Sequence, residues 1–193
     1  EHKALYRSVY QEVSDDYFTV ELGKASLLRE GDDVTIISYG AGVHWAIDTL
    51  KVHSEISADL IDLRTLQPLD VATIFESVRK TGKAIFLQED SLFGSIASDV
   101  AALINEHCFE SLDAPVKRVA SIETPIPFQG ELEKQYVPKH RFAEELKKLM
   151  KLEKIIIADD GWYNLRLYPV VTHTYLDGVI VYKNVAFKIA IFI

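Results

Sequence analysis

The chain has 193 residues, of which 48% are hydrophobic, and its 29 acidic against 21 basic residues give a formal net charge of -8. This length suffices for one domain, or for one domain with an appendage. The acidic balance argues against a nucleic-acid-binding protein, which needs a basic face to neutralise phosphates. No apolar run approaches the roughly 18 residues of a membrane-spanning helix, so we expect no membrane contact.

The beginning of the chain reads as a linker. Residues 1 to 16 are polar and aromatic without periodicity, and we expect a linker or arm. The start at Glu1 suggests a piece of a longer polypeptide, and the single cysteine, Cys108, fits a reducing compartment. Two short β-rich runs, residues 17–20 and 25–28, flank Gly23 and predict a short hairpin.

From residue 34 the pattern becomes regular. Apolar β-rich runs alternate with stretches whose apolar residues recur at helical spacing, and the runs are too continuous for half-exposed strands. The predicted strands span residues 34–39, 58–63, 83–88 and 116–121, and the predicted helices lie around residues 43–50, 71–79, 96–104 and 142–150. This alternation predicts an α/β fold with three α/β/α layers and a mostly parallel sheet, formed by residues 17–151.

After residue 151 the composition changes. Residues 152–193 are rich in Ile, Val and Tyr, and Asp177-Gly178 is typical of a hairpin turn. Two interpretations stand: a small antiparallel β meander, or a tail foreign to the domain.

The most informative segment is Ile61-Asp62-Leu63-Arg64-Thr65-Leu66-Gln67-Pro68-Leu69-Asp70. Its apolar half ends a strand at Arg64, and Asp70 precedes an i, i+3, i+4, i+7 apolar stripe, where it can cap a helix. Loops that join the carboxyl end of a strand to a helix are where α/β proteins usually bind their ligands.

Other chemical signals are weak. Gly40-Ala41-Gly42 joins a strand to a helix but is only part of a nucleotide fingerprint, which favours a tight structural turn. Gln88-Glu89-Asp90-Ser91 follows a strand and could supply acids or magnesium ligands, or simply cap the next helix. The six histidines show no metal-ligand spacing, and His44, in the first turn of a helix, is the best single candidate for a polar contact.

Several motifs together resemble one family. In order and spacing they resemble the C-terminal domain of the beta chain of thiamine-dependent 2-oxoacid dehydrogenases, which belongs to the transketolase C-terminal domain family. The residues of the motifs are most similar to those of the branched-chain (2-oxoisovalerate) type, and pyruvate-type chains are also similar. The resemblance covers about residues 17–150 and rests on five stretches: residues 33–40, 61–70, 77–82, 112–116 and 124–128.

The resemblance implies a component that decarboxylates 2-oxoisovalerate or pyruvate and passes the acyl group to a lipoyl-acyltransferase. It implies thiamine diphosphate and magnesium in the full enzyme, held between an alpha chain and an N-terminal half that this sequence lacks, so we expect no catalytic or cofactor-binding residue here. The implied role is assembly and docking, in a homo-oligomeric enzyme of the bacterial cytoplasm or, in a eukaryote, of the mitochondrial matrix.

Four residues are the candidate partner contacts. Arg64 is a candidate for an ion pair at an interface between chains, and His44 for a polar contact. Asp113 matches an acidic position of the family, and with nearby Glu110 it is a candidate contact for a basic acyltransferase domain. Solvated surface side chains are the ordinary alternative for each. Two other functions stay open: the same domain from a transketolase or deoxyxylulose-phosphate synthase, in which Arg64 would bind sugar phosphate, and a stand-alone binding module.

Overall fold

A computed structural model of the protein describes residues 2–3, 5–10 and 12–152, and the backbone of four short strands further on. The chain divides into two units, Glu1–Lys154 and Ile155–Ile193. The predicted turn at residues 177–178 lies outside the described residues. In the second unit, β6 (Ile155–Ile157) pairs antiparallel with β7 (Tyr163–Leu165), and β8 (Val179–Tyr182) pairs antiparallel with β9 (Val185–Lys188).

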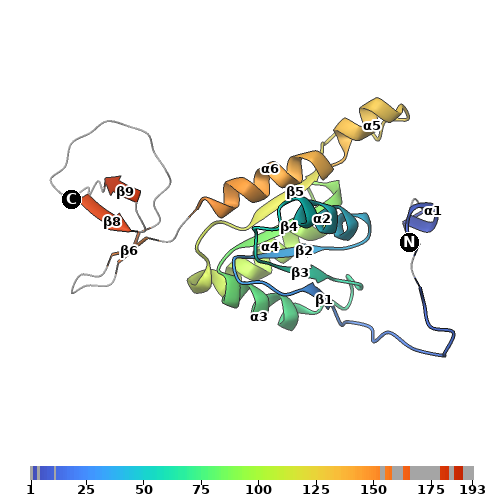
Figure 1. Ribbon diagram of the computed structural model, residues 1–193, viewed down its shortest axis with the longest axis horizontal. Coiled ribbons are helices and arrows are strands. Elements are labelled where there is room, and N and C mark those ends of the chain that lie inside the picture. The colour runs from blue at the N-terminus through green and yellow to red at the C-terminus, as the bar shows by residue number, and fades with distance from the viewer. Residues whose placement is uncertain are drawn as a thin grey trace. The chain divides into compact units, whose positions relative to one another are not determined.

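The first unit is built on a five-stranded sheet with strand order β1-β3-β2-β4-β5 (Figure 1). Its strands are β1 (Ser26–Arg29), β2 (Val34–Ser38), β3 (Ala58–Asp62), β4 (Ala84–Ser91) and β5 (Lys117–Ser121). The last four are parallel to one another, and only β1 is antiparallel, to β3. The predicted α/β fold with a mostly parallel sheet is therefore confirmed.

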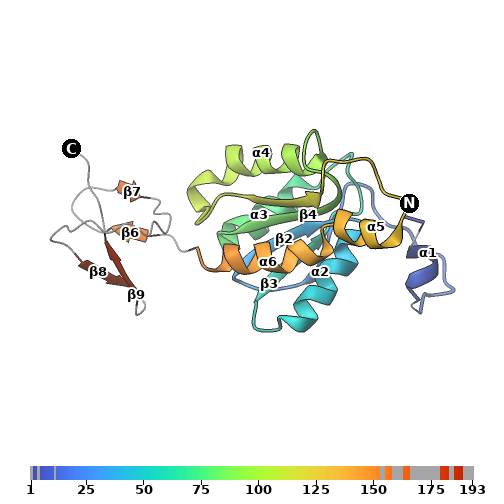
Figure 2. The same ribbon diagram turned by 90° about the horizontal axis from the view of Figure 1, so that it is seen from above.

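Helices cover both faces of this sheet (Figure 2). The helices are α1 (Leu5–Ser8), α2 (Ala41–Val52), α3 (Val71–Thr81), α4 (Ile96–Cys108), α5 (Gly130–Tyr136) and α6 (Lys139–Met150), with a 3-10 turn at Phe109–Ser111. One apolar cluster joins α2 and α6 to one face, and a second joins α3 and α4 to the other.

The alternation of side chains along β2 explains why its sequence is apolar without a break. Ile36 belongs to the cluster under α2 and α6, whereas Ile37 belongs to the cluster under α3 and α4. All five residues of β2 are buried, as expected for a central strand of a parallel sheet.

The predicted hairpin at residues 17–28 is wrong. Only residues 26–29 form a strand, and β1 pairs with β3, with a register shift between Leu27 and Arg29. Residues 12–25 contain no helix or strand. No sequence pattern predicted α5, because this helix buries none of its residues and so has no apolar stripe.

Candidate functional site

The carboxyl ends of the parallel strands form the candidate site, and segment 61–70 runs along it. The Leu63 N–H donates to Ser38 O at 2.9 Å, which ties the exit of β3 to that of β2. Arg64 then turns with a φ of 55°, a conformation that costs a non-glycine residue energy. Its N–H donates to Asp62 Oδ1 at 3.1 Å, and its side chain is exposed.

Asp70 caps α3 as predicted and also binds a distant segment of the chain. Its carboxylate accepts the Thr73 N–H at 3.2 Å, the Thr73 hydroxyl at 2.8 Å and the Ala25 N–H at 3.0 Å. Burial acts to raise the pKa of Asp70, but these hydrogen bonds outweigh it and hold the pKa below its usual value. The Gly23 N–H donates to Thr65 Oγ1 at 2.9 Å. Segment 61–70 therefore anchors the incoming chain at residues 23–25.

The turn at Gly40-Ala41-Gly42 is a packing device. A Cβ on Gly42 would lie 2.3 Å from Ser38 Oγ and 3.1 Å from the carbonyl oxygen of Leu87. Helix α2 thus approaches the sheet at a distance that only glycine allows. This favours the structural interpretation of the segment Gly40-Ala41-Gly42. His44 is half-buried in the first helical turn of α2.

The polar residues 88–91, which follow the third predicted strand, differ in what they contact. The buried Gln88 side chain donates to Ser91 O at 2.6 Å and accepts the Ala97 N–H at 3.1 Å, so it holds the start of α4. Glu89 contacts the His2 ring at 2.6 Å. Burial, then Asp90 and then Glu89, raise the pKa of Tyr39, which indicates that negative charge gathers near the end of β2.

These residues do not fit the implied cofactor. Among the described residues, no group of three or more His, Cys, Asp or Glu side chains could hold a metal ion. In the glycine turn, Ser38 and Leu87 occupy the space beside Gly42, and only the space beside Gly40 is open. Among the described residues, magnesium would therefore find no set of carboxylate or histidine ligands.

The four candidate contact residues lie at opposite ends of the sheet. Arg64 and His44 lie at the carboxyl ends of the strands. Asp113 lies at the other end, where its N–H donates to Gly82 O at 2.7 Å, beside the close of α3. Glu110 is exposed in the 3-10 turn that follows α4, next to Asp113 in the chain. The sequence offered all four as partner contacts without a position in the fold, and the structure distributes them over two surfaces.

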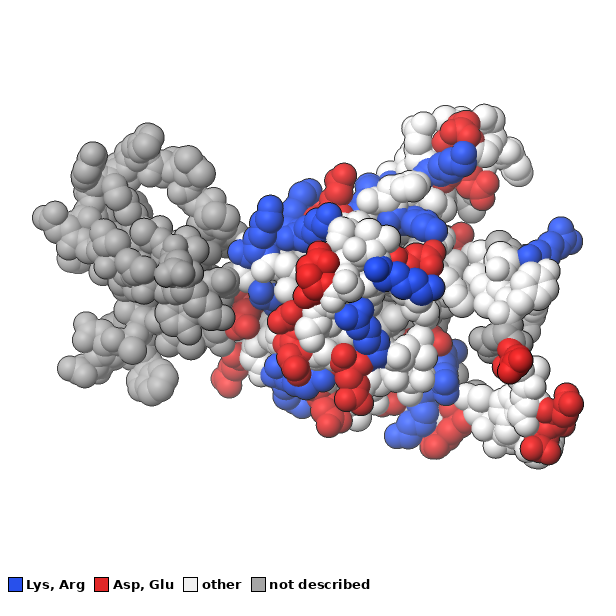
Figure 3. Space-filling model, in the orientation of Figure 1, with Lys and Arg blue, Asp and Glu red and all other residues white. Residues whose placement is uncertain are grey.

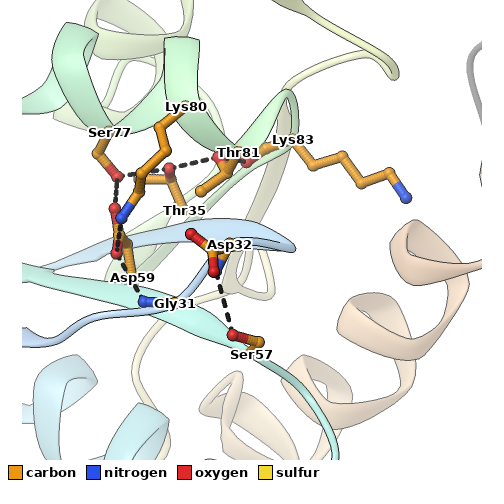
Figure 4. Close-up of polar contacts among 9 residues, drawn as sticks. All are labelled: Gly31, Asp32, Thr35, Ser57, Asp59, Ser77, Lys80, Thr81 and Lys83. Carbon is orange, nitrogen blue, oxygen red and sulfur yellow. Dashed lines mark hydrogen bonds and ion pairs between the residues drawn. The ribbon is translucent and has the colours of Figure 1, made fainter.

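A buried polar network centred on Asp59, which no sequence motif predicted, lies at the amino end of β3 (Figure 4). Asp59 on β3, 1% exposed, accepts the Gly31 N–H at 2.9 Å, Lys80 Nζ at 2.7 Å and the Ser77 hydroxyl at 2.5 Å. The hydrogen bond to Asp59 raises the pKa of Lys80, against the effect of burial. The signal in the sequence was Asp59, which lies near the start of the apolar run of residues 58–63, whereas the second acid of that run, Asp62, lies at its exit.

The loops that leave β4 and β5 expose large apolar side chains. The Phe93 side chain is 85% exposed after β4, and Ile126 and Phe128 are 68% and 106% exposed after β5. Basic and acidic side chains are intermixed over the visible face of this unit, without a basic stripe (Figure 3). In the part of the chain that the structure describes, no helix combines the length and apolarity needed to cross a bilayer.

The fold and its motifs define the class of protein. Residues 23–141 match the family Transketolase, C-terminal domain. The match covers more than half of the chain, so the protein belongs to this family. A solved structure, "Split gene transketolase, inactive beta4 tetramer", is similar with a TM-score of 0.59 and 27% identity, over 75% of this chain and 47% of that one.

Among curated proteins the similarity is to beta subunits. The chain is 48% identical over 146 residues to "Pyruvate dehydrogenase E1 component subunit beta" of Bacillus subtilis (strain 168), covering 73% of this chain and 44% of the relative. It is 45% identical over 140 residues to "2-oxoisovalerate dehydrogenase subunit beta" of the same strain, covering 71% and 43%. The chain thus spans less than half the length of these relatives.

Proposed function

We propose that this chain is the assembly and docking part of the decarboxylating component of a 2-oxoacid dehydrogenase complex, acting on 2-oxoisovalerate or pyruvate. The family match at residues 23–141, together with 45% to 48% identity to two dehydrogenase beta subunits, supports the proposal. Thiamine diphosphate and magnesium would be held by the rest of the enzyme. The chain alone then performs no decarboxylation.

The carboxyl edge of the sheet is the proposed contact with the alpha chain or the N-terminal half of the enzyme. Arg64 presents an exposed guanidinium from a backbone held at a φ of 55°, and such an outlier is a reason to look for function. His44 stands at the same edge, and the exposed side chains of Phe93 and Phe128 supply apolar surface on neighbouring loops. Apolar anchors with charged neighbours are the ordinary composition of a stable interface.

The opposite end of the sheet is the proposed dock for the lipoyl-acyltransferase. Asp113 and Glu110 place two carboxylates beside the end of α3. Opposite charge accelerates and orients the encounter with a basic domain. Separate ends for separate partners would let the domain hold both at once.

The test is the affinity of the chain for the basic peripheral domain of the acyltransferase at low salt. We expect Glu110→Lys to slow association by about threefold to tenfold, since exposed interface charges act mainly on the association rate. Glu131→Lys is the matched control, an exposed charge reversal on α5, and should change nothing. Equal rates for wild type and both variants would contradict the docking role of Glu110.

A transketolase-like role is the second candidate, favoured by the similar solved transketolase. It predicts sugar-phosphate binding that Arg64→Ala abolishes. Saturable binding of a pentose phosphate with that dependence would replace the docking proposal.

A further inference from the structure

The loop and helix between β5 and α6 form an apolar projection, here defined as residues 122–136. None of these residues is buried, and Figure 1 shows α5 standing beyond the helices that cover the sheet. The apolar side chains of the projection face solvent, with Ile126 68%, Leu132 53% and Phe128 106% exposed. Residues 124–130 carry no charge. An uncharged apolar surface that a domain leaves in water is typical of a protein–protein contact.

Arg141 on α6 holds the base of the projection. Its guanidinium donates to the carbonyl oxygens of Ala120 at 2.7 Å, Gln135 at 2.9 Å and Tyr136 at 3.2 Å. The Ile122 N–H donates to Tyr136 O at 3.3 Å, which joins the two ends of the projection. A planar fork of donors can bind three separate carbonyl groups in fixed directions, and an ammonium cannot hold them in the same way. The backbone of the projection is therefore fixed where it leaves the domain.

The outer part of the projection is ordered as well. Pro125 and Pro127 each fix one backbone angle and keep the residue before them extended. The Gln129 side chain accepts the Leu132 N–H at 2.9 Å and so caps α5. Phe128 lies between these two ordered segments. Because its surroundings are ordered before any partner arrives, a contact through Phe128 loses little conformational entropy on binding.

The start of the chain lies at the base of the same projection. The His2 ring contacts the Glu89 carboxylate at 2.6 Å, near the carboxyl end of β4. The carbonyl oxygen of Glu89 accepts the hydroxyl of Ser121, the residue directly before the projection. Figure 2 shows the N-terminus and α5 at the same end of the sheet. A domain that precedes residue 1 would therefore lie beside the projection.

The relatives contain such a preceding domain. This chain covers only 44% and 43% of the two dehydrogenase beta subunits, and the family to which it belongs is a C-terminal domain, so the unmatched part of these relatives precedes it. We propose that the projection anchors this domain to the N-terminal half of the enzyme, with Phe128 in an apolar cleft of that half and Arg141 as the positioning residue. The inference rests on the proposed function and selects one of the two partners named there.

Hydrogen–deuterium exchange measured by mass spectrometry tests the partner. The 193-residue chain is compared with a joined chain, in which the N-terminal part of the Bacillus subtilis pyruvate dehydrogenase beta subunit precedes residue 1 of this chain. We expect exchange in residues 122–136 to slow by about tenfold or more in the joined chain, since a covered segment opens less often. Residues 109–115, at the other end of the sheet, are the internal control and should exchange equally in both chains.

Substitutions at the tip test the anchor. Phe128→Asp should return the exchange of the projection in the joined chain to the rate seen in the 193-residue chain, because a carboxylate would enter an apolar cleft. Ile126→Asp should do so in part. Val52→Asp is the matched control, since Val52 is an apolar residue of α2 that is 75% exposed, and it should leave the exchange slow. Circular dichroism establishes that each variant is folded.

The positioning role of Arg141 is tested in the same two chains. Arg141→Lys keeps the charge but loses the fork, so exchange of the projection in the joined chain should accelerate by about threefold or more. Arg118→Lys is the matched control on β5, where Arg118 donates to Leu92 O and Ser98 Oγ instead, and it should change nothing in residues 122–136. A lower Tm in both chains with unchanged protection of the projection would contradict positioning.

Equal exchange of residues 122–136 in the 193-residue and joined chains would overturn the proposal. Protection that appears only when an alpha subunit of pyruvate dehydrogenase is added would overturn it too, because the alpha chain is then the occupant. Protection that grows with the concentration of the 193-residue chain would do the same in favour of a second copy. Each result leaves acyltransferase docking at the other end of the sheet intact, and loss of that docking with a protected projection would overturn the proposed docking role alone.

Discussion

Replacing Asp59 with alanine removes the acceptor at the centre of the buried network. The carboxylate is 1% exposed and receives three donors, from Gly31, Ser77 and Lys80. These donors belong to the turn before β2 and to α3, so Asp59 on β3 joins three separate segments. Thr35 on β2 continues the chain of hydroxyls, 2.7 Å from both Ser77 and Thr81.

The cost follows from what each donor can do without Asp59. The Gly31 N–H belongs to a buried residue and loses its partner, which costs about 1–3 kcal/mol. The Ser77 hydroxyl keeps Thr35 as a neighbour and loses about 0.5–1 kcal/mol. The Lys80 side chain is 41% exposed and regains water, so its loss is that of a surface pair, up to about 1 kcal/mol. We expect a total near 3 kcal/mol.

Thermal unfolding followed by circular dichroism measures this loss. A change of about 3 kcal/mol corresponds to roughly 6–12 °C in Tm for a domain of this size. Asp32→Ala is the control, because Asp32 is an exposed aspartate in the same turn whose carboxylate accepts no hydrogen bond within the network, and it should shift stability by less than about 0.5 kcal/mol. Equal Tm values for the two variants would refute the account of the network.

Two other predictions concern the candidate site. Gly42→Ala should destabilise the domain by about 1–3 kcal/mol in urea unfolding, since its Cβ would meet Ser38 Oγ; Gly130→Ala, where nothing lies within 4 Å, should not, and equal midpoints would contradict the packing argument. The pKa of Asp70 is lowered in the folded state. The stabilising contribution of its carboxylate to the free energy of unfolding is therefore complete above the unfolded pKa of about 3.9, and it is lost as the pH falls through the folded pKa. The stability gap between wild type and Asp70→Asn should therefore be constant from pH 7 to 5 and shrink below about pH 4, and a gap unchanged at pH 3 would contradict it.

The regular part of the fold was predictable because its apolar pattern is set by burial. Helix α3 shows this, because three signals predict the same bounds: Asp70 caps its start, an apolar stripe follows, and Gly82 takes the left-handed conformation directly after its last residue. Strand β4 was predicted to end at residue 88 but continues to Ser91, because polar residues at the carboxyl edge still pair. The helix α5 contacts no core and leaves no periodic signal.

The candidate site was predictable only in part. The sequence located segment 61–70 and its cap, but the bond from Asp70 to Ala25 joins residues 45 positions apart, and no local pattern encodes such a contact. For the same reason Arg64 and Asp113 could not be assigned to opposite ends of the sheet before the strand order was known. The hairpin at residues 17–28 failed because Thr65 and Asp70 compete for the backbone that would have closed it.

Docking itself can be measured by biolayer interferometry between this chain and the lipoyl-acyltransferase of a 2-oxoacid dehydrogenase complex, at 20 mM and 300 mM salt. We expect saturable binding that weakens strongly at the higher salt, as expected for an acidic surface and a basic domain. No binding at 20 mM salt, with the chain folded by circular dichroism, would contradict it.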